Sequence, residues 1–369
     1  MLTFTDKSQC CGCTACASIC PKQCIQMIED KEGFLYPQIN HSVCVDCGLC
    51  EKVCPVLHPV LAKEKPVVFA ALNNNSEVRM QSSSGGIFTL LAEQTIKNGG
   101  VVFGACFDKE WKVVHRYTAT LEGLSVFRGS KYVQSDMGTS FQDAKCFLDQ
   151  GREVLFSGTP CQIAGLRNYL RKSYSTLLTV EVACHGVPSP KVWSTYLLDK
   201  KNISYINFRA KSKGWKGYYV VLEYNGQKEE VPYGENSYMR VFLSNLSLRP
   251  SCYACSAKLG NSQSDVTIAD FWGVDKIAPE IDDDKGCSLI IIHNSKILQL
   301  LKALNCQLYP QTLDIALKYN RSIVKSCYQP VNRKFFFTLI DRCGFVCACY
   351  MVSRKNIFCR LIRTLYRKL

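Results

Sequence analysis

Eight cysteines near the start of the chain have the spacing that holds iron–sulfur clusters. They form two runs of the pattern C-x2-C-x2-C-x3-C-P, made of Cys10, Cys13, Cys16 and Cys20, then Cys44, Cys47, Cys50 and Cys54. Such a run places three thiolates around one cubane, and its fourth cysteine ligates the other cluster. We therefore predict two [4Fe–4S] clusters, one on Cys10, Cys13, Cys16 and Cys54 and one on Cys20, Cys44, Cys47 and Cys50.

Two other uses of clustered cysteines fit this pattern less well. Zinc sites also use C-x2-C pairs, but they need neither a third cysteine at the same spacing nor a cross-paired fourth. Disulfides need an oxidising compartment, whereas the N-terminal MLTFTDKSQCCGC has no basic region and no long apolar run of a secretion signal. We therefore expect a reducing cytoplasm, and we interpret Cys11 and Cys24, which lie outside the spacing, as spare thiols.

A third cluster site is predicted from four cysteines farther along the chain. Cys252 and Cys255 form a C-x2-C pair, which needs two more ligands. Cys161 and Cys184 each follow a predicted strand, and the carboxyl ends of strands form the edge at which open α/β sheets bind ligands. A helix N-terminus at Cys161 would also favour the thiolate. The remaining internal cysteines are interpreted as core residues: Cys106, Cys146, Cys287, Cys306 and Cys327.

The elements that must position these cysteines suggest a small α+β ferredoxin-like module followed by an α/β domain. Residues 1–57 form the module, with short strands at 25–28 and 34–39, and 58–66 are a linker. Residues 67–150 and 151–335 form two successive regions of the α/β part, and 336–369 a basic tail. Strands are predicted at 67–72, 101–107, 154–156, around 180 and at 266–269, with helices over 86–98, 139–150 and from Cys161, and antiparallel strands over 203–233.

A glycine-rich turn opens the first helix of the α/β part. Ser84, Gly85 and Gly86 precede an amphipathic helix, and exposed backbone N–H groups at such a helix start suit a phosphate. An ordinary capped helix explains the same residues equally well, because G-x-G-x-x-G is absent. Lys131, in the loop GSKYVQS, could pair with a phosphate or a flavin carbonyl, and a solvated loop lysine is the simpler interpretation.

Composition limits the partners. The 369 residues include 23 cysteines and carry a formal net charge of +14. The basic residues are spread along the chain without a nucleic-acid-binding motif, so we expect no nucleic-acid partner and favour acidic proteins, anionic lipid or a phosphate-bearing cofactor. No stretch of about 18 apolar residues is evident, so no membrane-spanning helix is expected.

The tail is basic and amphipathic. Over 357–369 apolar residues fall on one helical face, and residues 341–369 contain seven basic residues and one acidic residue. Such a helix can lie on an anionic membrane surface, which would place the protein at the inner face of the membrane. Docking onto the protein itself or onto a partner subunit is the alternative.

Several segments in order resemble the family of beta subunits of coenzyme F420 hydrogenase and its dehydrogenase relatives. They are SSSGG (82–86), GSKYVQS (129–135), GTPCQIAGLR (158–167), CHGVPSP (184–190) and CYAC…SDVTIADFWG (252–273). The resemblance implies an α/β fold around FAD and a nearby [4Fe–4S] cluster, with Ser84, Gly85, Gly86, Lys131 and Thr159 lining the flavin. It also assigns the third cluster to Cys161, Cys184, Cys252 and Cys255. The CHGVPSP form resembles bacterial members, some of them similar to proteins encoded among polysaccharide-synthesis genes.

These features together suggest a flavin-dependent iron–sulfur oxidoreductase. A ferredoxin-like donor or a partner redox subunit would exchange electrons with the clusters, and FAD would deliver two electrons to a small-molecule substrate. His185 is the candidate proton donor, and a structural histidine beside a cluster cysteine is equally consistent with the sequence. The alternatives are a non-catalytic electron-transfer subunit of a larger complex and an iron–sulfur scaffold at a membrane surface.

Overall fold

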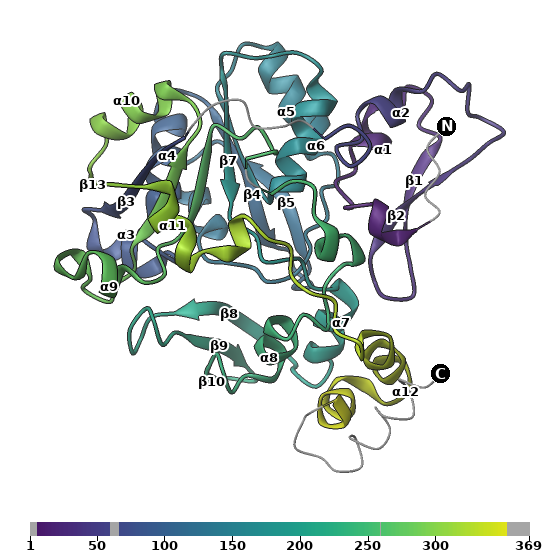
Figure 1. Ribbon diagram of the computed structural model, residues 1–369. Helices are drawn as coiled ribbons and strands as arrows, with labels where there is room; N and C mark the ends of the chain where they lie inside the picture. The colour runs from purple at the N-terminus through teal and green to yellow at the C-terminus, as the bar shows by residue number, and fades with distance from the viewer. Residues whose placement is uncertain (1–5, 60–65, 259, 353–369) are drawn as a thin grey trace.

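The computed structural model describes residues 6–59, 66–258 and 260–352. Within them the strands form a two-stranded, an eight-stranded and a three-stranded sheet (Figure 1). The two-stranded sheet belongs to the N-terminal module, which lies beside the domain built on the large sheet. The three-stranded sheet forms a separate layer next to that domain (Figure 1).

The N-terminal module is one hairpin with two very short helices. Strands β1 (Ile25–Glu29) and β2 (Leu35–Ile39) pair antiparallel, which confirms the two predicted strands. Helices α1 (Ala15–Ile19) and α2 (Leu49–Lys52) each carry cysteines of one run. Its own apolar cluster contains only four buried residues, and three of these are cysteines: Cys16, Cys24, Ile25 and Cys54. So small a core leaves the metal ligands as the main stabilising feature of the module.

The large sheet has the strand order β13-β3-β12-β11-β7-β6-β4-β5. Its strands are β3 (Val67–Asn73), β4 (Val101–Phe107), β5 (Val113–Thr118), β6 (Val154–Gly158), β7 (Leu177–Val182), β11 (Val266–Asp270), β12 (Ser288–Ile292) and β13 (Cys306–Gln311). Strands β4, β6, β7 and β11 are parallel neighbours, and β12, β13 and β5 pair antiparallel to the strands beside them. The predicted strands of the α/β part are confirmed. However, β3 and β4 are separated by four other strands, so the helix between them makes a wide crossover.

Helices cover both faces of the large sheet because its strands are apolar on both sides. Phe69 and Ala71 of β3 pack with α4 (Ile87–Lys97) and α10 (Ser295–Ala303), while Val68, Ala70 and Leu72 face α11 (Leu313–Tyr319) and α9 (Val274–Ile277). Helices α5 (Ser140–Asp149) and α6 (Pro160–Leu170) cover the β4–β6 end of this second face. The helices predicted at 86–98, at 139–150 and from Cys161 are thereby confirmed.

The third sheet and the C-terminal helix share one core. Strands β8 (Ile203–Ala210), β9 (Tyr219–Tyr224) and β10 (Gln227–Pro232) confirm the antiparallel strands predicted over 203–233. They pack with α7 (Pro190–Leu197), α8 (Ser237–Leu243) and α12 (Arg333–Val352) around Trp193 and Tyr238. The remaining short elements are α3 (Ser76–Gln81) and the 3-10 turns η1 (Lys7–Gln9), η2 (Glu122–Phe127), η3 (Pro250–Ala254), η4 (Pro279–Ile281) and η5 (Arg321–Ile323).

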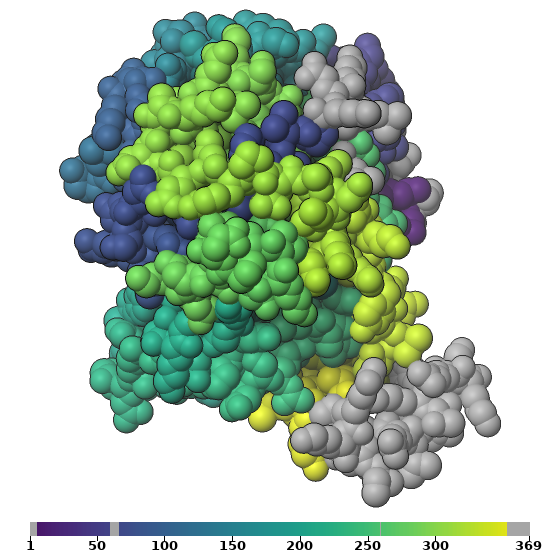
Figure 2. Space-filling view, turned by 60° about the vertical axis from the view of Figure 1, so that its left-hand side comes forward, coloured from purple at the N-terminus to yellow at the C-terminus, as the bar shows by residue number. Residues whose placement is uncertain are grey.

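Helix α12 corrects the expectation that no segment is long and apolar enough to span a membrane. Among the described residues it is the one helix that meets that requirement by length and composition. Gly344, with φ 74°, breaks it into two shorter helices, and Phe336, Phe337 and Phe345 are buried in the shared core. The C-terminal segment runs down the side of the molecule to reach this place (Figure 2). The amphipathic helix predicted at 357–369 lies outside the described residues.

Candidate functional site

The first predicted ligand set is buried inside the N-terminal module. Cys10, Cys13, Cys16 and Cys54 are each at most 9% exposed. Burial raises the pKa of the Cys16 thiol to about 12, and the sulfurs of Cys10 and Cys54 add to the effect, so the three lie close together. Crowded, buried thiols ionise only when a positive metal centre compensates them, and this donor set therefore fits an iron–sulfur cluster.

The second predicted set lies at the module's outer end. All four cysteines of this set line one open cavity, and Cys47 is exposed to solvent; the four are Cys20, Cys44, Cys47 and Cys50. Cys24 lines the same cavity, and its sulfur is 3.4 Å from that of Cys20. Cys24, predicted to be a spare thiol, therefore has a place beside the second ligand set.

The third predicted set gathers where the large sheet ends. Cys161 is the second residue of α6, directly after β6, and Cys184 follows the neighbouring parallel strand β7. The 3-10 turn η3 brings Cys252 and Cys255 to the same place, and all four line one open cavity, the third cavity. The structure thus brings together four cysteines that are spread between positions 161 and 255 of the sequence.

Electrostatics in the third cavity also suit a metal cluster. Burial raises the pKa of the Cys184 thiol to about 12, with the Cys161 and Cys255 sulfurs adding to the effect and Lys258 opposing it. Burial, followed by the Cys184 sulfur, raises the pKa of Cys252 well above its usual value. The Lys258 ammonium donates to the carbonyls of Cys184 and Ser322, which fixes a positive charge at the cavity wall. The sequence analysis did not identify Lys258 as part of this site, because no sequence motif marks a single lysine.

Cys11 links the first and third ligand sets. It lines the third cavity, although it lies between two ligands of the first set in sequence. The pKa of the Cys161 thiol is raised well above its usual value, mainly by a hydrogen bond with the Cys11 thiol. Cys11 also forms a hydrogen bond with the Cys13 thiol. The interpretation of Cys11 as a spare thiol therefore missed its place at the junction of two sites.

His185, the predicted proton donor, lies in the lining of the third cavity. Its Nε2 is 2.6 Å from Oδ1 of Asn245, and its ring meets Phe242 edge to face. Burial lowers the pKa of His185, so the imidazole is neutral at pH 7. A neutral imidazole held by an amide oxygen is suited to positioning, and its role in proton transfer stays a prediction.

The N-terminal module is docked tightly on the α/β domain. Helix α1 packs on α6, where the space that a side chain at Gly165 would need is filled by Cys13. The guanidinium of Arg249 enters the module and donates to the carbonyls of Cys10, at 2.8 Å, and Leu35, at 2.9 Å. Arg333 forms a two-pronged ion pair with Glu32 of the hairpin loop. These contacts fix the first ligand set next to the third.

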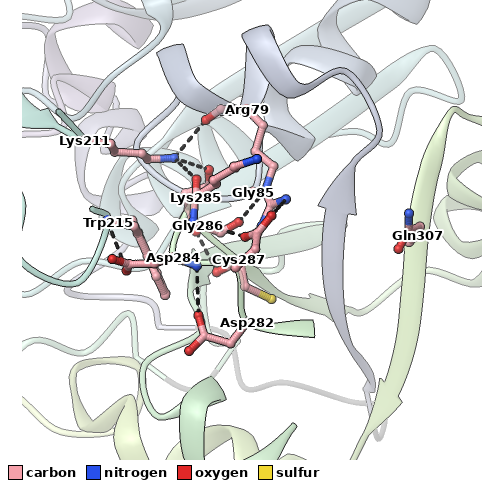
Figure 3. A network of polar contacts seen from close by, with 12 residues as sticks. Arg79, Gly85, Lys211, Trp215, Asp282, Asp284, Lys285, Gly286, Cys287 and Gln307 are labelled. Carbon is pink, nitrogen blue, oxygen red and sulfur yellow. Dashed lines mark hydrogen bonds and ion pairs between the residues drawn. The ribbon is translucent and has the colours of Figure 1, made fainter. Parts of the chain in front are cut away.

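The glycine-rich turn predicted to line a flavin is occupied by protein contacts. A Cβ on Gly85 would lie 2.4 Å from the carbonyl oxygen of Ala71, and the backbone N–H of Gly85 donates to Oγ of Ser288. Figure 3 shows Gly85 beside Gly286 and Cys287. Ser84 Oγ donates to the carbonyl of Cys287, and Gly86 takes φ 81° to start α4. Close packing between the turn and the sheet therefore accounts for these residues.

Two further residues assigned to the flavin are engaged in the same way. Lys131 Nζ donates to the carbonyls of Val126 and Arg128, at 2.8 and 2.9 Å. Thr159 caps α6 through Gln162, and its hydroxyl is 3.3 Å from the Cys161 sulfur. The side chains of Ser84, Lys131 and Thr159 thus have protein partners, and the assignment of these five residues to a flavin stays a prediction.

A single metal ion fits these sites poorly. Within the described ranges, no three His, Cys, Asp or Glu side chains converge as the ligands of one ion do. Each cysteine of a cubane binds a different iron, so its ligands surround a cavity instead of a point. The second and third sets have this arrangement.

Two known families match separate parts of the chain. Residues 9–57 match the 4Fe–4S dicluster domain, and residues 151–316 match the C terminus of the coenzyme F420 hydrogenase/dehydrogenase beta subunit. The dicluster match confirms the prediction of iron–sulfur clusters in the N-terminal module. The individual ligand assignments stay predictions.

Individual relatives cover parts of the chain. The F subunit of F(420)H(2) dehydrogenase from Methanosarcina mazei is 22% identical over 239 residues, which are 60% of this chain and 66% of that relative, just under two thirds. The PorD subunit of pyruvate synthase from Methanothermobacter marburgensis is 37% identical over 62 residues, covering 17% of this chain and 67% of the relative. A chain from the F420-reducing [NiFe] hydrogenase complex of Methanosarcina barkeri is 17% identical with a TM-score of 0.49, covering 77% of this chain and 94% of that one.

Proposed function

Because this chain belongs to the family of coenzyme F420 hydrogenase/dehydrogenase beta subunits and carries a 4Fe–4S dicluster domain, we propose that it relays single electrons through three iron–sulfur clusters. Clusters of this kind supply one-electron transfer when bound. The observation that carries the proposal is the arrangement of the ligands. The exposed Cys47 marks one end, the buried first set lies in the middle, and the third cavity is reached through Cys11.

The protein's own residues explain why electrons would follow this order. Cys47 opens the second set to solvent, where a ferredoxin-like donor or a partner redox subunit can approach. Cys16 interacts with Cys50 of the second set as well as with Cys10 and Cys54, so the two N-terminal sets adjoin. Cys11 then connects Cys13 to Cys161. Each set is thereby in contact with the next, as short-range electron transfer requires.

The relay would serve a larger oxidoreductase system. One relative is named as part of F420H2 dehydrogenase, which supports assembly of this chain with partner redox subunits. Delivery to FAD and a small-molecule substrate, with Ser84–Gly86, Lys131 and Thr159 at the flavin, and a link to polysaccharide synthesis are further parts of the proposal. A cytoplasmic location with the basic tail at an anionic membrane is proposed from sequence alone.

Metal and flavin analysis of anaerobically purified protein tests the proposal. We expect about twelve irons and as many sulfides per chain, since each cubane contains four of each. About eight irons would overturn the third site and leave a two-cluster module on an α/β domain. Stoichiometric flavin would extend the relay to a two-electron acceptor, and its absence would favour the non-catalytic electron-transfer subunit.

A further inference from the structure

One arginine lies between the first and third ligand sets. Arg249 has 0% of its surface exposed and lies three positions before Cys252. Its Nη2 is 3.6 Å from the sulfur of Cys10. Arg249 is also the N-cap residue of η3, the turn that carries Cys252 of the third set. The same guanidinium donates to two carbonyls of the module and, at 3.0 Å, to Oε1 of Gln134.

The charge of Arg249 has no carboxylate partner in the described part of the chain. Four arginines are buried there, and three of them form ion pairs with carboxylates: Arg79 with Asp283, Arg209 with Asp270 and Arg333 with Glu32. Arg249 instead has neutral acceptors, the aromatic faces of Phe34 and Tyr36, and the Cys10 sulfur. A buried cation requires an anion nearby, because desolvation of an unpaired charge is strongly unfavourable.

The backbone is shaped to admit this side chain. Gly12 has φ +72°, and a Cβ there would lie 2.7 Å from Nη1 of Arg249 and 2.8 Å from Nε2 of Gln134. Gln134 in turn donates through Nε2 to the carbonyl of Cys11, at 3.1 Å. The cysteine run of the module therefore wraps around the guanidinium, with Cys10, Cys11 and Gly12 all in contact with Arg249 or with its partner Gln134.

We propose that Arg249 is the counter-cation of the cluster held by Cys10, and that its charge raises the reduction potential of that cluster. The inference rests on the proposed electron relay. Thiolate-ligated cubanes are anionic, and each added electron increases the negative charge, so a fixed cation and a hydrogen bond to a ligand sulfur both favour the reduced form. Arg249 is a positioning residue that makes the middle set of the relay easier to reduce than it would be without the cation.

Potentiometric titration of the full chain, followed by electron paramagnetic resonance, tests this. In Arg249→Gln we expect the midpoint reduction potential of one cluster to fall by ~59 mV. For a one-electron couple this corresponds to an about tenfold drop in the ratio of reduced to oxidised cluster at a fixed potential. Arg249→Lys should restore most of the shift. The double variant Arg333→Gln with Glu32→Gln is the matched control, since it breaks a buried contact of the module without leaving an uncompensated charge, and its midpoints should stay those of the wild type.

A second pair of variants separates charge from folding. If Arg249→Gln fails to retain iron, two variants of Gln134 replace it. Gln134→Glu places a carboxylate against the guanidinium. Gln134→Met removes the hydrogen bonds of Gln134 with Arg249 and with the Cys11 carbonyl and adds no charge. Gln134→Glu should have the lower midpoint of the two. Equal midpoints in this pair, or wild-type midpoints in iron-loaded Arg249→Gln, would overturn the role of Arg249. Loss of the third cluster alone would contradict the relay while leaving this measurement on the N-terminal clusters intact.

Discussion

Gly165 of α6 lies directly against Cys13: a Cβ at Gly165 would come within 2.9 Å of both the Cβ and the Sγ of Cys13. A glycine inside a helix costs about 1 kcal/mol relative to alanine, so its presence here is explained by the close approach of the N-terminal module. The contact joins a predicted cluster ligand to the helix that begins with Cys161 as its second residue.

Gly165→Ala is therefore expected to loosen the module even though alanine favours the helix. So close a contact requires the neighbouring atoms to shift, and Cys13 cannot move without disturbing its ligand set. We expect lower iron content and faster proteolysis between the module and the α/β domain. Gly217→Ala, at a glycine with no atom within 4 Å of the added Cβ, is the control. Wild-type iron content and proteolysis in Gly165→Ala would show that the interface is more adaptable than its geometry indicates.

Cys252→Ser tests the third ligand set. Removal of one of four cysteine ligands should lower the iron content from about twelve to about eight per chain, because the two N-terminal sets use none of these residues. Cys146→Ser provides a matched change, since Cys146, interpreted from sequence as a core residue, is instead exposed on α5 and accepts a hydrogen bond from the side chain of Gln150. Iron content that stays at the wild-type value in Cys252→Ser would remove the third cluster from the proposal.

The local elements and the grouping of the cysteines could be predicted because much of both is encoded over short distances. Cysteine spacing identified the two N-terminal sets, and strand-end positions placed Cys161 and Cys184 correctly at one edge of the sheet. The order of the strands and the packing of helices depend on contacts between residues far apart in sequence, and only the structure shows these. Strand β3 lies between β12 and β13, far from β4, and α12 completes a core with α7. No local pattern contains that information.

The residues between the sites were also beyond prediction. Arg249 is preceded in sequence by ordinary loop residues, and only the docked module shows that it is buried beside Cys10. Cys11 and Cys24 fall outside the ligand spacing, yet both line cavities with predicted ligands. Conversely, the glycines of the SSSGG turn resembled a phosphate cradle, whereas close packing against Ala71 and Ser288 is what requires Gly85.

Removal of iron should unfold the N-terminal module while the large sheet persists. Helices α1 and α2 have five and four residues, and the apolar cluster of the module is mostly cysteine, so little besides the metal stabilises it. Hydrogen exchange of chelator-treated protein should show β1 and β2 losing protection by an order of magnitude or more. Strands β6 and β7 are the internal control, because they are buried between helices. Unchanged protection of the hairpin would mean that docking on the α/β domain suffices to fold the module.

Glu181 makes stability depend on pH near neutrality. It is 3% exposed on β7 and accepts hydrogen bonds from Ser262, Ser264 and Thr267. Burial raises the pKa of this carboxyl from 4.5 to about 7, with the hydrogen bonds opposing the effect. The folded protein thus holds the proton more tightly than the unfolded chain. The stability from the neutral carboxyl is fully present below pH 4.5 and is lost as the pH rises through 7.

Glu181→Gln should remove this dependence because an amide cannot ionise. Relative to wild type, the variant should gain up to about 3 kcal/mol between pH 5 and pH 8, at about 1.4 kcal/mol for each unit of pKa shift. Urea midpoints of the anaerobic, iron-loaded protein at both pH values measure the gain. Glu235→Gln, at an exposed carboxyl, controls for the general loss of one negative charge and should leave the pH slope unchanged. Parallel pH slopes for wild type and Glu181→Gln would show that Glu181 is ionised throughout, with Lys258 compensating its charge.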